Sequence, residues 1–191
     1  IGNLTARALF GGNDNQSKEA VQRKIESVGG NLDTVWTPDY TLIECVTTKL
    51  AFPDAFYVIT QALKSPEFDS ETVTFARRSM NDDITREFQT PFRVAYSALR
   101  TRLFSQGPYR NDFGGNPDSL KRITFQGLRT YFNKRFCPSN IVISIVGNVT
   151  VSQVQTVIKN EWSDFERVGA KSVPFPDSEI VIEPEPIKRR L

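Results

Sequence analysis

Apolar residues along this 191-residue chain follow two patterns that predict different elements. In some segments they recur every three or four residues, which places them on one face of a helix, and Ser, Thr or Pro often stands where such a segment begins. In other segments they alternate or run together, as in strands. The helical spacing predicts helices over 17–28, 52–63, 70–88, 91–103, 125–136 and 151–162.

Three extended segments are predicted between these helices. Residues 31–37 and 40–50 are rich in Thr, Val and Ile around a Pro38-Asp39 turn, and this pattern is typical of a hairpin. Residues 141–146 form a continuous apolar run, which predicts a central strand buried on both faces. Strands, grouped helices, one more strand and a helix predict an α+β fold with a mostly antiparallel sheet and helices packed on one side of it.

The residue pattern also predicts where several helices begin and which faces they bury. Ser70, Thr124 and Thr150 are the expected caps, because their hydroxyls can accept hydrogen bonds from the first turn. Residues 105–117, rich in Gly, Pro, Asn and Asp, are expected to form a loop. The helix that opens at Pro91 is predicted to bury one stripe, made of Phe92, Ala95, Tyr96, Leu99 and Leu103.

The composition changes after residue 168. Residues 1–168 are predicted to form one domain. Residues 169–191 contain four prolines and read as a linker toward a second domain, interrupted by a short strand at 179–182.

Charge and cysteine content exclude several classes of protein. The chain has 24 basic and 22 acidic residues, and a net charge of +2 is too small to indicate nucleic-acid binding. No apolar run is long enough to predict a transmembrane segment. Cys45 and Cys137 lie beside apolar residues and are predicted to be buried free thiols.

The most informative count is that of histidine, which is zero. Without histidine there is no imidazole base, no Ser-His or Cys-His pair, and no catalytic zinc site of the usual kinds. We therefore expect no hydrolase chemistry of these types, no metal and no cofactor.

Four segments, in an order that covers about residues 2–165, resemble one half of a pitrilysin (insulinase-like) zinc metallopeptidase, specifically the first domain of a non-catalytic half. They are ALFGG (8–12) followed by IESVGGNL (25–32), LKSPEF (63–68), GPY (107–109) followed by SLKRIT (119–124), and CPSNI (137–141) running into VGNV (146–149). The resemblance implies the α+β fold of LuxS- and pitrilysin-type metalloenzymes.

The resemblance also implies that the family's zinc site is lost. The inverted motif H-x-x-E-H aligns with residues 3–7, where Asn3 and Arg7 replace the two histidine ligands and Ala6 replaces the glutamate base. The family's third ligand, a glutamate on a downstream helix, aligns within 74–78, where there is no carboxylate. A permanent positive charge at residue 7 opposes a bound cation.

By this resemblance the chain is an inactive peptidase subunit or domain that pairs with an active zinc peptidase and helps to form a peptide chamber. The alternative is a structural core subunit of a respiratory bc1-type complex. A third possibility is a module that binds a peptide strand at its sheet edge. The expected location is the bacterial periplasm or cell envelope, with the mitochondrion as the alternative.

No substrate-binding residue is assigned by the sequence. Asp82, Asp83 and Glu87 are predicted to lie on a solvated helix face. Tyr109 and Arg110 lie in the predicted loop and are the candidates for a binding role.

Overall fold

The computed structural model describes residues 1–10, 12–13, 16–17, 23, 30–104, 106–111 and 114–165. The predicted linker and its strand lie outside these residues, as does most of the predicted helix 17–28, within which Arg23 is helical and Ser17 belongs to a strand. The described elements are α1 (Gly2–Ala8), β1 (Gly12–Asn13), β2 (Gln16–Ser17), β3 (Asn31–Trp36), β4 (Thr41–Val46), α3 (Phe52–Lys64), α4 (Ser70–Phe88), α5 (Pro91–Leu103), η1 (Pro108–Arg110), α6 (Pro117–Lys121), α7 (Phe125–Arg135), η2 (Pro138–Asn140) and α8 (Val151–Trp162).

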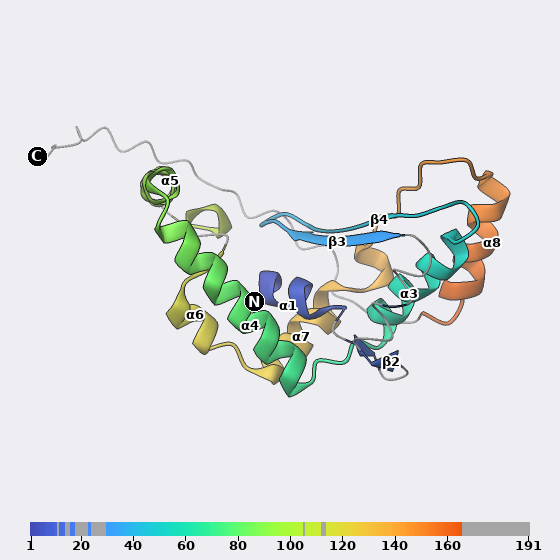
Figure 1. Ribbon diagram of the computed structural model, residues 1–191, viewed down its shortest axis with the longest axis horizontal. Helices are drawn as coiled ribbons and strands as arrows, with labels where there is room; N and C mark the ends of the chain where they lie inside the picture. Colours follow the sequence, from blue (N-terminus) through green and yellow to red (C-terminus); the bar gives the residue numbers. More distant parts are fainter. Residues whose placement is uncertain are drawn as a thin grey trace, which may run out of the picture.

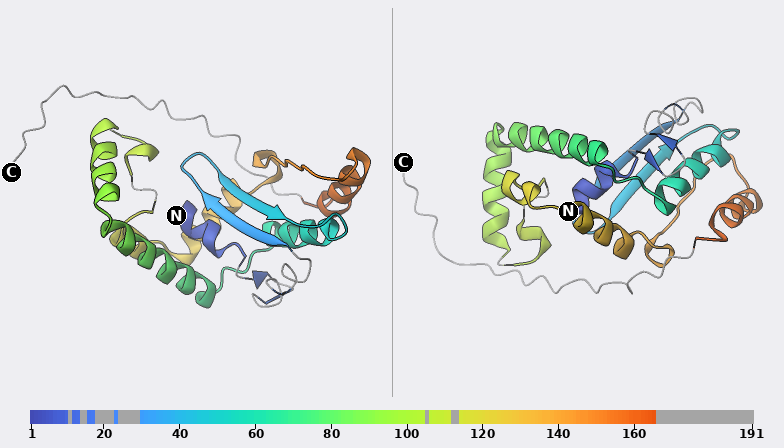
Figure 2. Two further views of the ribbon diagram at one scale, coloured as in Figure 1. Left: turned by 45° about the horizontal axis from the view of Figure 1, so that its top comes forward. Right: turned by 90° about the horizontal axis from the view of Figure 1, so that it is seen from below.

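Helix α1 lies in the middle of the molecule and contacts α4, α7 and strand β3 (Figure 1). Helices α5 and α6 lie toward one end, and α3 and α8 lie toward the other. The two further views show the same arrangement (Figure 2). The short helix α1 therefore depends on its neighbours, since seven residues are too few to form a stable helix alone.

The predicted hairpin is confirmed. Strands β3 and β4 pair antiparallel, in a register that joins Asn31 to Val46 and Trp36 to Thr41. Exposed and half-buried residues alternate along both strands, as expected where one face packs on a core. With helices making up most of the described chain, the α+β class is confirmed and the antiparallel sheet is small; the likeness to LuxS stays a prediction.

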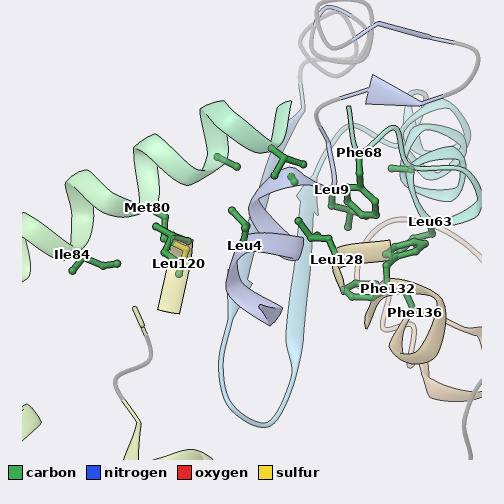
Figure 3. Close-up of a cluster of buried hydrophobic side chains, with 14 of the residues drawn as sticks. Leu4, Leu9, Leu63, Phe68, Met80, Ile84, Leu120, Leu128, Phe132 and Phe136 are labelled. Atoms are coloured by element: carbon green, nitrogen blue, oxygen red, sulfur yellow. The ribbon is translucent and has the colours of Figure 1, made fainter. Parts of the chain in front are cut away.

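One hydrophobic core surrounds α1 (Figure 3). Its phenylalanine rings lie close together, with centroids 5.4 Å apart for Phe68 and Phe132 and 4.9 Å apart for Phe132 and Phe136. The labelled core side chains are Leu4, Leu9, Leu63, Phe68, Met80, Ile84, Leu120, Leu128, Phe132 and Phe136. These residues come from α1, α3, α4, α6, α7 and the segments beside them, so the core joins these helices, whereas α5 contributes none of its residues.

Gly2 allows α1 to approach its neighbours closely. A Cβ atom at this position would lie 2.2 Å from Nε1 of Trp36 and 2.7 Å from the hydroxyl oxygen of Tyr131. Any other residue would force α1 or the side chains of Trp36 and Tyr131 to shift. The position of the first turn of α1 thus depends on glycine.

The predicted strand at 141–146 is wrong for the described structure. These residues belong to no ladder, and Val142 and Val146 are 95% and 96% exposed. A doubly buried strand needs a neighbour on each side, whereas β3 and β4 pair with each other alone in their sheet. Ile141 does pack against the core.

The predicted burial of α5 is also wrong, although the helix itself is confirmed. Phe92, Tyr96, Leu99 and Leu103 are all exposed, and Arg100 is the buried residue of this helix. Helical spacing identified the apolar stripe correctly, but it does not reveal whether another element covers that stripe.

The caps are partly as predicted. Thr124 and Thr150 accept hydrogen bonds from the backbone nitrogens of Gly127 and Gln153 at the start of α7 and α8. In α4 the cap is Asp69, whose carboxylate accepts from the backbone nitrogen of Thr72, and the predicted cap Ser70 is the first helical residue. The predicted loop 105–117 contains η1 and ends where a capping box starts α6.

Both cysteines are free thiols. Cys137 is fully buried and Cys45 is half-buried, and burial raises the pKa of the Cys45 thiol. Among the described helices, none has the length and apolar character needed to cross a membrane.

Candidate functional site: the polar contact between α1 and α4

The candidate site lies on the polar face of α1. Leu4 and Ala8 are buried on the opposite face, which fixes the rotation of the helix and directs Asn3 and Arg7 outward. Asn3 and Arg7 are one turn apart and therefore lie on the same face. The structure thus brings together Asn3 and Arg7, the two residues that the sequence resemblance placed at the positions of the histidine ligands.

The guanidinium of Arg7 is held by three polar groups. Its Nε donates to the Oδ1 of Asn3 at 2.9 Å, and its Nη1 donates to the hydroxyl of Ser79 at 3.3 Å. The same Nη1 lies 2.7 Å from Oδ2 of Asp83. Arg7 is therefore held by Asn3 of its own helix, and it connects α1 to α4 through Ser79 and Asp83.

Helix α4 presents Ser79 and Asp83 one turn apart toward α1. Asp83 also accepts from Arg86 at 2.5 Å, so its carboxylate lies between two guanidinium groups. The prediction that Asp83 lies on a solvated face is wrong in this respect, because its side chain is 38% exposed and ion-paired across the helix contact.

The segment in which the sequence resemblance placed the third ligand, residues 74–78, does not contact Arg7. Ala76 is buried in the core, and Arg77 donates to the backbone carbonyl of Ile123 at 2.9 Å. The carboxylate that pairs with Arg7 is that of Asp83, farther along α4.

The side chains at this site do not fit a zinc ion. Zinc sites are built from neutral imidazole, thiolate and carboxylate groups, whereas Arg7 offers donors only and carries a permanent charge. Ala6, where the family has its glutamate base, is buried and brings no proton acceptor. Within the described part of the chain, no cluster of three His, Cys, Asp or Glu side chains could hold a metal ion. The chemistry available here is an ion pair supported by hydrogen bonds.

The loop candidates Tyr109 and Arg110 make contacts elsewhere. The hydroxyl of Tyr109 donates to the carboxylate of Asp39 in the hairpin turn, and this hydrogen bond is the main reason that the pKa of Tyr109 is raised. Arg110 donates to the backbone carbonyl of Phe104 at 3.2 Å. These contacts connect η1 to the hairpin and to the end of α5, so a stabilising role accounts for both residues.

Sequence comparison relates the chain to zinc peptidases. A family model described as the peptidase M16 inactive domain matches residues 122–191, a range that starts just before α7 and lies outside the α1 site. The uncharacterized zinc protease SCO5738 of Streptomyces coelicolor is 22% identical over 166 residues, which are 87% of this chain and 36% of that protein.

Two mitochondrial proteins are also similar. A probable mitochondrial-processing peptidase subunit beta of Arabidopsis thaliana is 24% identical over 155 residues, covering 79% of this chain and 28% of that protein. Cytochrome b-c1 complex subunit 1 of Mus musculus is 21% identical over 164 residues, covering 83% of this chain and 33% of that protein. This chain spans about a third of the length of these relatives.

Solved structures share the fold. A peptidase M16 inactive domain from Pseudomonas fluorescens superposes with a TM-score of 0.82 at 19% identity, over 92% of this chain and 43% of that one. The periplasmic protease PqqL of Escherichia coli superposes with a TM-score of 0.80 at 17% identity, over 91% of this chain and 20% of that one. The resemblance to this family that the sequence motifs indicated is confirmed.

Proposed function

Because this chain is related to the zinc peptidases of family M16 and matches the family's inactive domain, we propose that it is a catalytically inactive M16 subunit or domain. In this proposal it pairs with a homologous active zinc peptidase and supplies one wall of the chamber in which that partner cleaves peptides. Its own part in the reaction is to complete and support the partner's chamber.

One observation carries the proposal: the guanidinium of Arg7, at a position where the resemblance implies a zinc ligand, forms an ion pair with Asp83. A mere loss of ligands would leave a weak cation site, whereas the guanidinium of Arg7 adds a positive charge and engages a carboxylate of the facing helix. Together with the buried Ala6, this arrangement supports a role without chemistry of its own.

The alternative function is a structural core subunit of a respiratory complex. Similarity to the mouse cytochrome b-c1 subunit favours it, and the fold accommodates either role. The location of the protein in the cell distinguishes these two functions. We propose the bacterial periplasm or cell envelope for the peptidase assembly, in line with the periplasmic PqqL, and the mitochondrion for the alternative.

The test is to purify the full-length protein from its native cells with whatever is bound to it, and to measure zinc, haem and peptide cleavage in the complex. We expect a zinc-containing homologous partner and cleavage that is lost when this chain is removed. A haem-containing complex without cleavage would establish the alternative, and cleavage by a partner that needs no copy of this chain would refute the proposal.

Adding the chain back provides the matched control. The complex depleted of this chain should regain cleavage with the wild-type chain and equally with an Arg7→Ala variant of it, since residue 7 takes no part in the chemistry. If Arg7→Ala binds the partner but fails to restore cleavage, the α1 site takes part in the reaction.

A further inference from the structure

Helix α5 carries a stripe of large apolar side chains that the described part of the chain leaves exposed. The exposed fractions are 73% for Phe92, 44% for Tyr96, 52% for Leu99 and 37% for Leu103. The rings of Phe92 and Tyr96 stack with centroids 6.2 Å apart, so part of the stripe is already ordered. Large apolar side chains gathered on one helix face usually mark a site of interaction.

The spacing of the stripe indicates what kind of surface covers it. Its members follow one another at intervals of four, three and four residues, which is the a/d pattern of a coiled-coil seam over two heptads. On a helix these four positions fall within an arc of about 60°, from a rotation of about 100° per residue. A membrane-bound helix has a broad apolar face, whereas a seam this narrow fits one partner helix.

The stripe is held in a fixed orientation. Arg100 is buried on the adjacent face of α5, where its Nη2 donates to the backbone carbonyl of Asn111 at 2.8 Å. Its guanidinium also lies over the ring of Tyr96, 5.5 Å from the centroid. Among the described elements, the main packing partners of helix α5 are α4 and η1. The helix lies at the end of the molecule opposite α8 (Figure 2). The seam is therefore preorganised and accessible.

The charged residues beside the seam indicate what charge the partner helix carries. Arg93 and Arg102 flank it at the positions that form salt bridges between helices in coiled coils, and α5 contains no acidic residue. Arg93 also lies 4.0 Å from Oε1 of Glu87 on α4, which leaves Arg102 as the main guanidinium for a partner. A second copy of the chain would bring no carboxylate from its own α5 to pair with these arginines. A partner helix with carboxylates beside its own apolar residues would instead pair with these guanidinium groups.

We propose that the stripe Phe92–Tyr96–Leu99–Leu103 is the docking seam for an amphipathic helix of a partner protein, one that carries Asp or Glu on both sides of its apolar stripe. The inference goes beyond the proposed function, because it rests on α5 alone and would stand whatever the partner catalyses. Its test needs no peptidase activity, so failure of either proposal leaves the other open to its own test.

The experiment titrates the full chain into a fluorescein-labelled synthetic helix of three heptads, with Leu at positions a and d and Glu at e and g. The matched control helix has Lys in place of Glu. We expect the Glu helix to bind at least about ten-fold more tightly than the Lys helix, and more weakly at high salt. The variant Arg102→Glu should reduce the difference in affinity between the Glu helix and the Lys helix, or reverse it.

Variants of the chain locate the binding site. The double variant Phe92→Ser/Leu99→Ser should weaken binding of the Glu helix by about ten-fold or more, because it removes the centre of the seam. The control variants Leu50→Ser and Val151→Ser change residues that are 90% and 73% exposed outside α5, and they should bind as the wild type does. Circular dichroism verifies that each variant is folded.

Three results would overturn the inference. Equal affinity for the Glu and Lys helices would show apolar adhesion without the proposed charge recognition. A dimer of the wild-type chain that the double variant dissolves would make a second copy the occupant. Binding to vesicles of phosphatidylglycerol and phosphatidylcholine that the double variant abolishes would make it a lipid surface.

Discussion

At the scale of single residues, Arg7 decides the character of the α1 site. Its guanidinium is fixed by Asn3 from its own helix and by Ser79 and Asp83 from α4. The sequence alone was enough to predict that residue 7 opposes a cation, because the charge of arginine does not depend on its surroundings. It did not predict Asp83 as the partner, because the two lie 76 positions apart in the sequence and only the packing of α1 on α4 brings them together.

The ion pair should be measurable by a double-mutant cycle with Arg7→Ala and Asp83→Ala. We expect a coupling of about 0.5–1 kcal/mol in the free energy of unfolding, at the upper end for partly exposed pairs. The measurement is urea unfolding, repeated in 1 M salt, where the coupling should shrink. Lys121 and Asp118 are the control pair, since they are 3.9 Å apart and about four-fifths exposed, and their coupling should be near zero. A coupling no larger for Arg7 and Asp83 than for this control would contradict the role given to Arg7.

Lys64 and Asp164 connect the end of α3 to the chain just after α8, with 2.5 Å between the lysine nitrogen and the carboxylate. This hydrogen bond is the main reason that the pKa of Asp164 is lowered. A carboxyl group with a lowered folded-state pKa stabilises the protein above its unfolded pKa, about 4, and that contribution is lost as the pH falls through the folded-state pKa.

We therefore expect Asp164→Asn to lower the free energy of unfolding at pH 7, and the difference from wild type to disappear toward pH 2. Urea unfolding at a series of pH values measures this. In a Lys64→Met background the same substitution should have little effect at any pH. A difference that persists in acid would mean that the substitution acts through packing or through the backbone.

At the scale of elements, capping residues and apolar spacing predicted most boundaries but not what surrounds each element. The hairpin, α3, α4, α5, α7 and α8 lie close to where the sequence placed them, because local hydrogen bonding and spacing determine them. Residues 141–146 and the stripe of α5 share one reason for failure. Each is apolar enough to be buried, and each is exposed because burial needs a neighbouring element, which local sequence does not specify.

The start of α4 gives a direct test at this scale. Asp69→Ala should destabilise the protein by about 1 kcal/mol, because the backbone nitrogen of Thr72 loses its acceptor. Ser70→Ala, one residue later, should change the stability by less than about 0.5 kcal/mol, since Ser70 is an exposed first-turn residue. Thermal or urea unfolding distinguishes the two, and a larger loss for Ser70→Ala would restore the cap that the sequence pattern favoured.

At the scale of the whole molecule, the packing of α1 against α4 brings together polar residues that lie far apart in the sequence. Positions 3 and 7 share one helix face, and Asp83 lies opposite them on the facing helix. Two histidines and one carboxylate in this arrangement would be a set that catalytic zinc sites use. The α+β class could be anticipated from motif order, whereas the arrangement of these three residues depends on the tertiary contact alone. The loss of the zinc ligands stays a prediction.

Whether the chain is inactive can be tested by measuring the zinc content and peptide cleavage of the purified full chain, next to an Asn3→His/Arg7→His variant. The wild-type chain should bind no stoichiometric zinc and cleave no peptide. The variant should bind about one zinc ion per chain, and a further Asp83→Ala change should abolish that binding. Stoichiometric zinc in the wild-type chain, with cleavage that a chelator stops, would contradict the account.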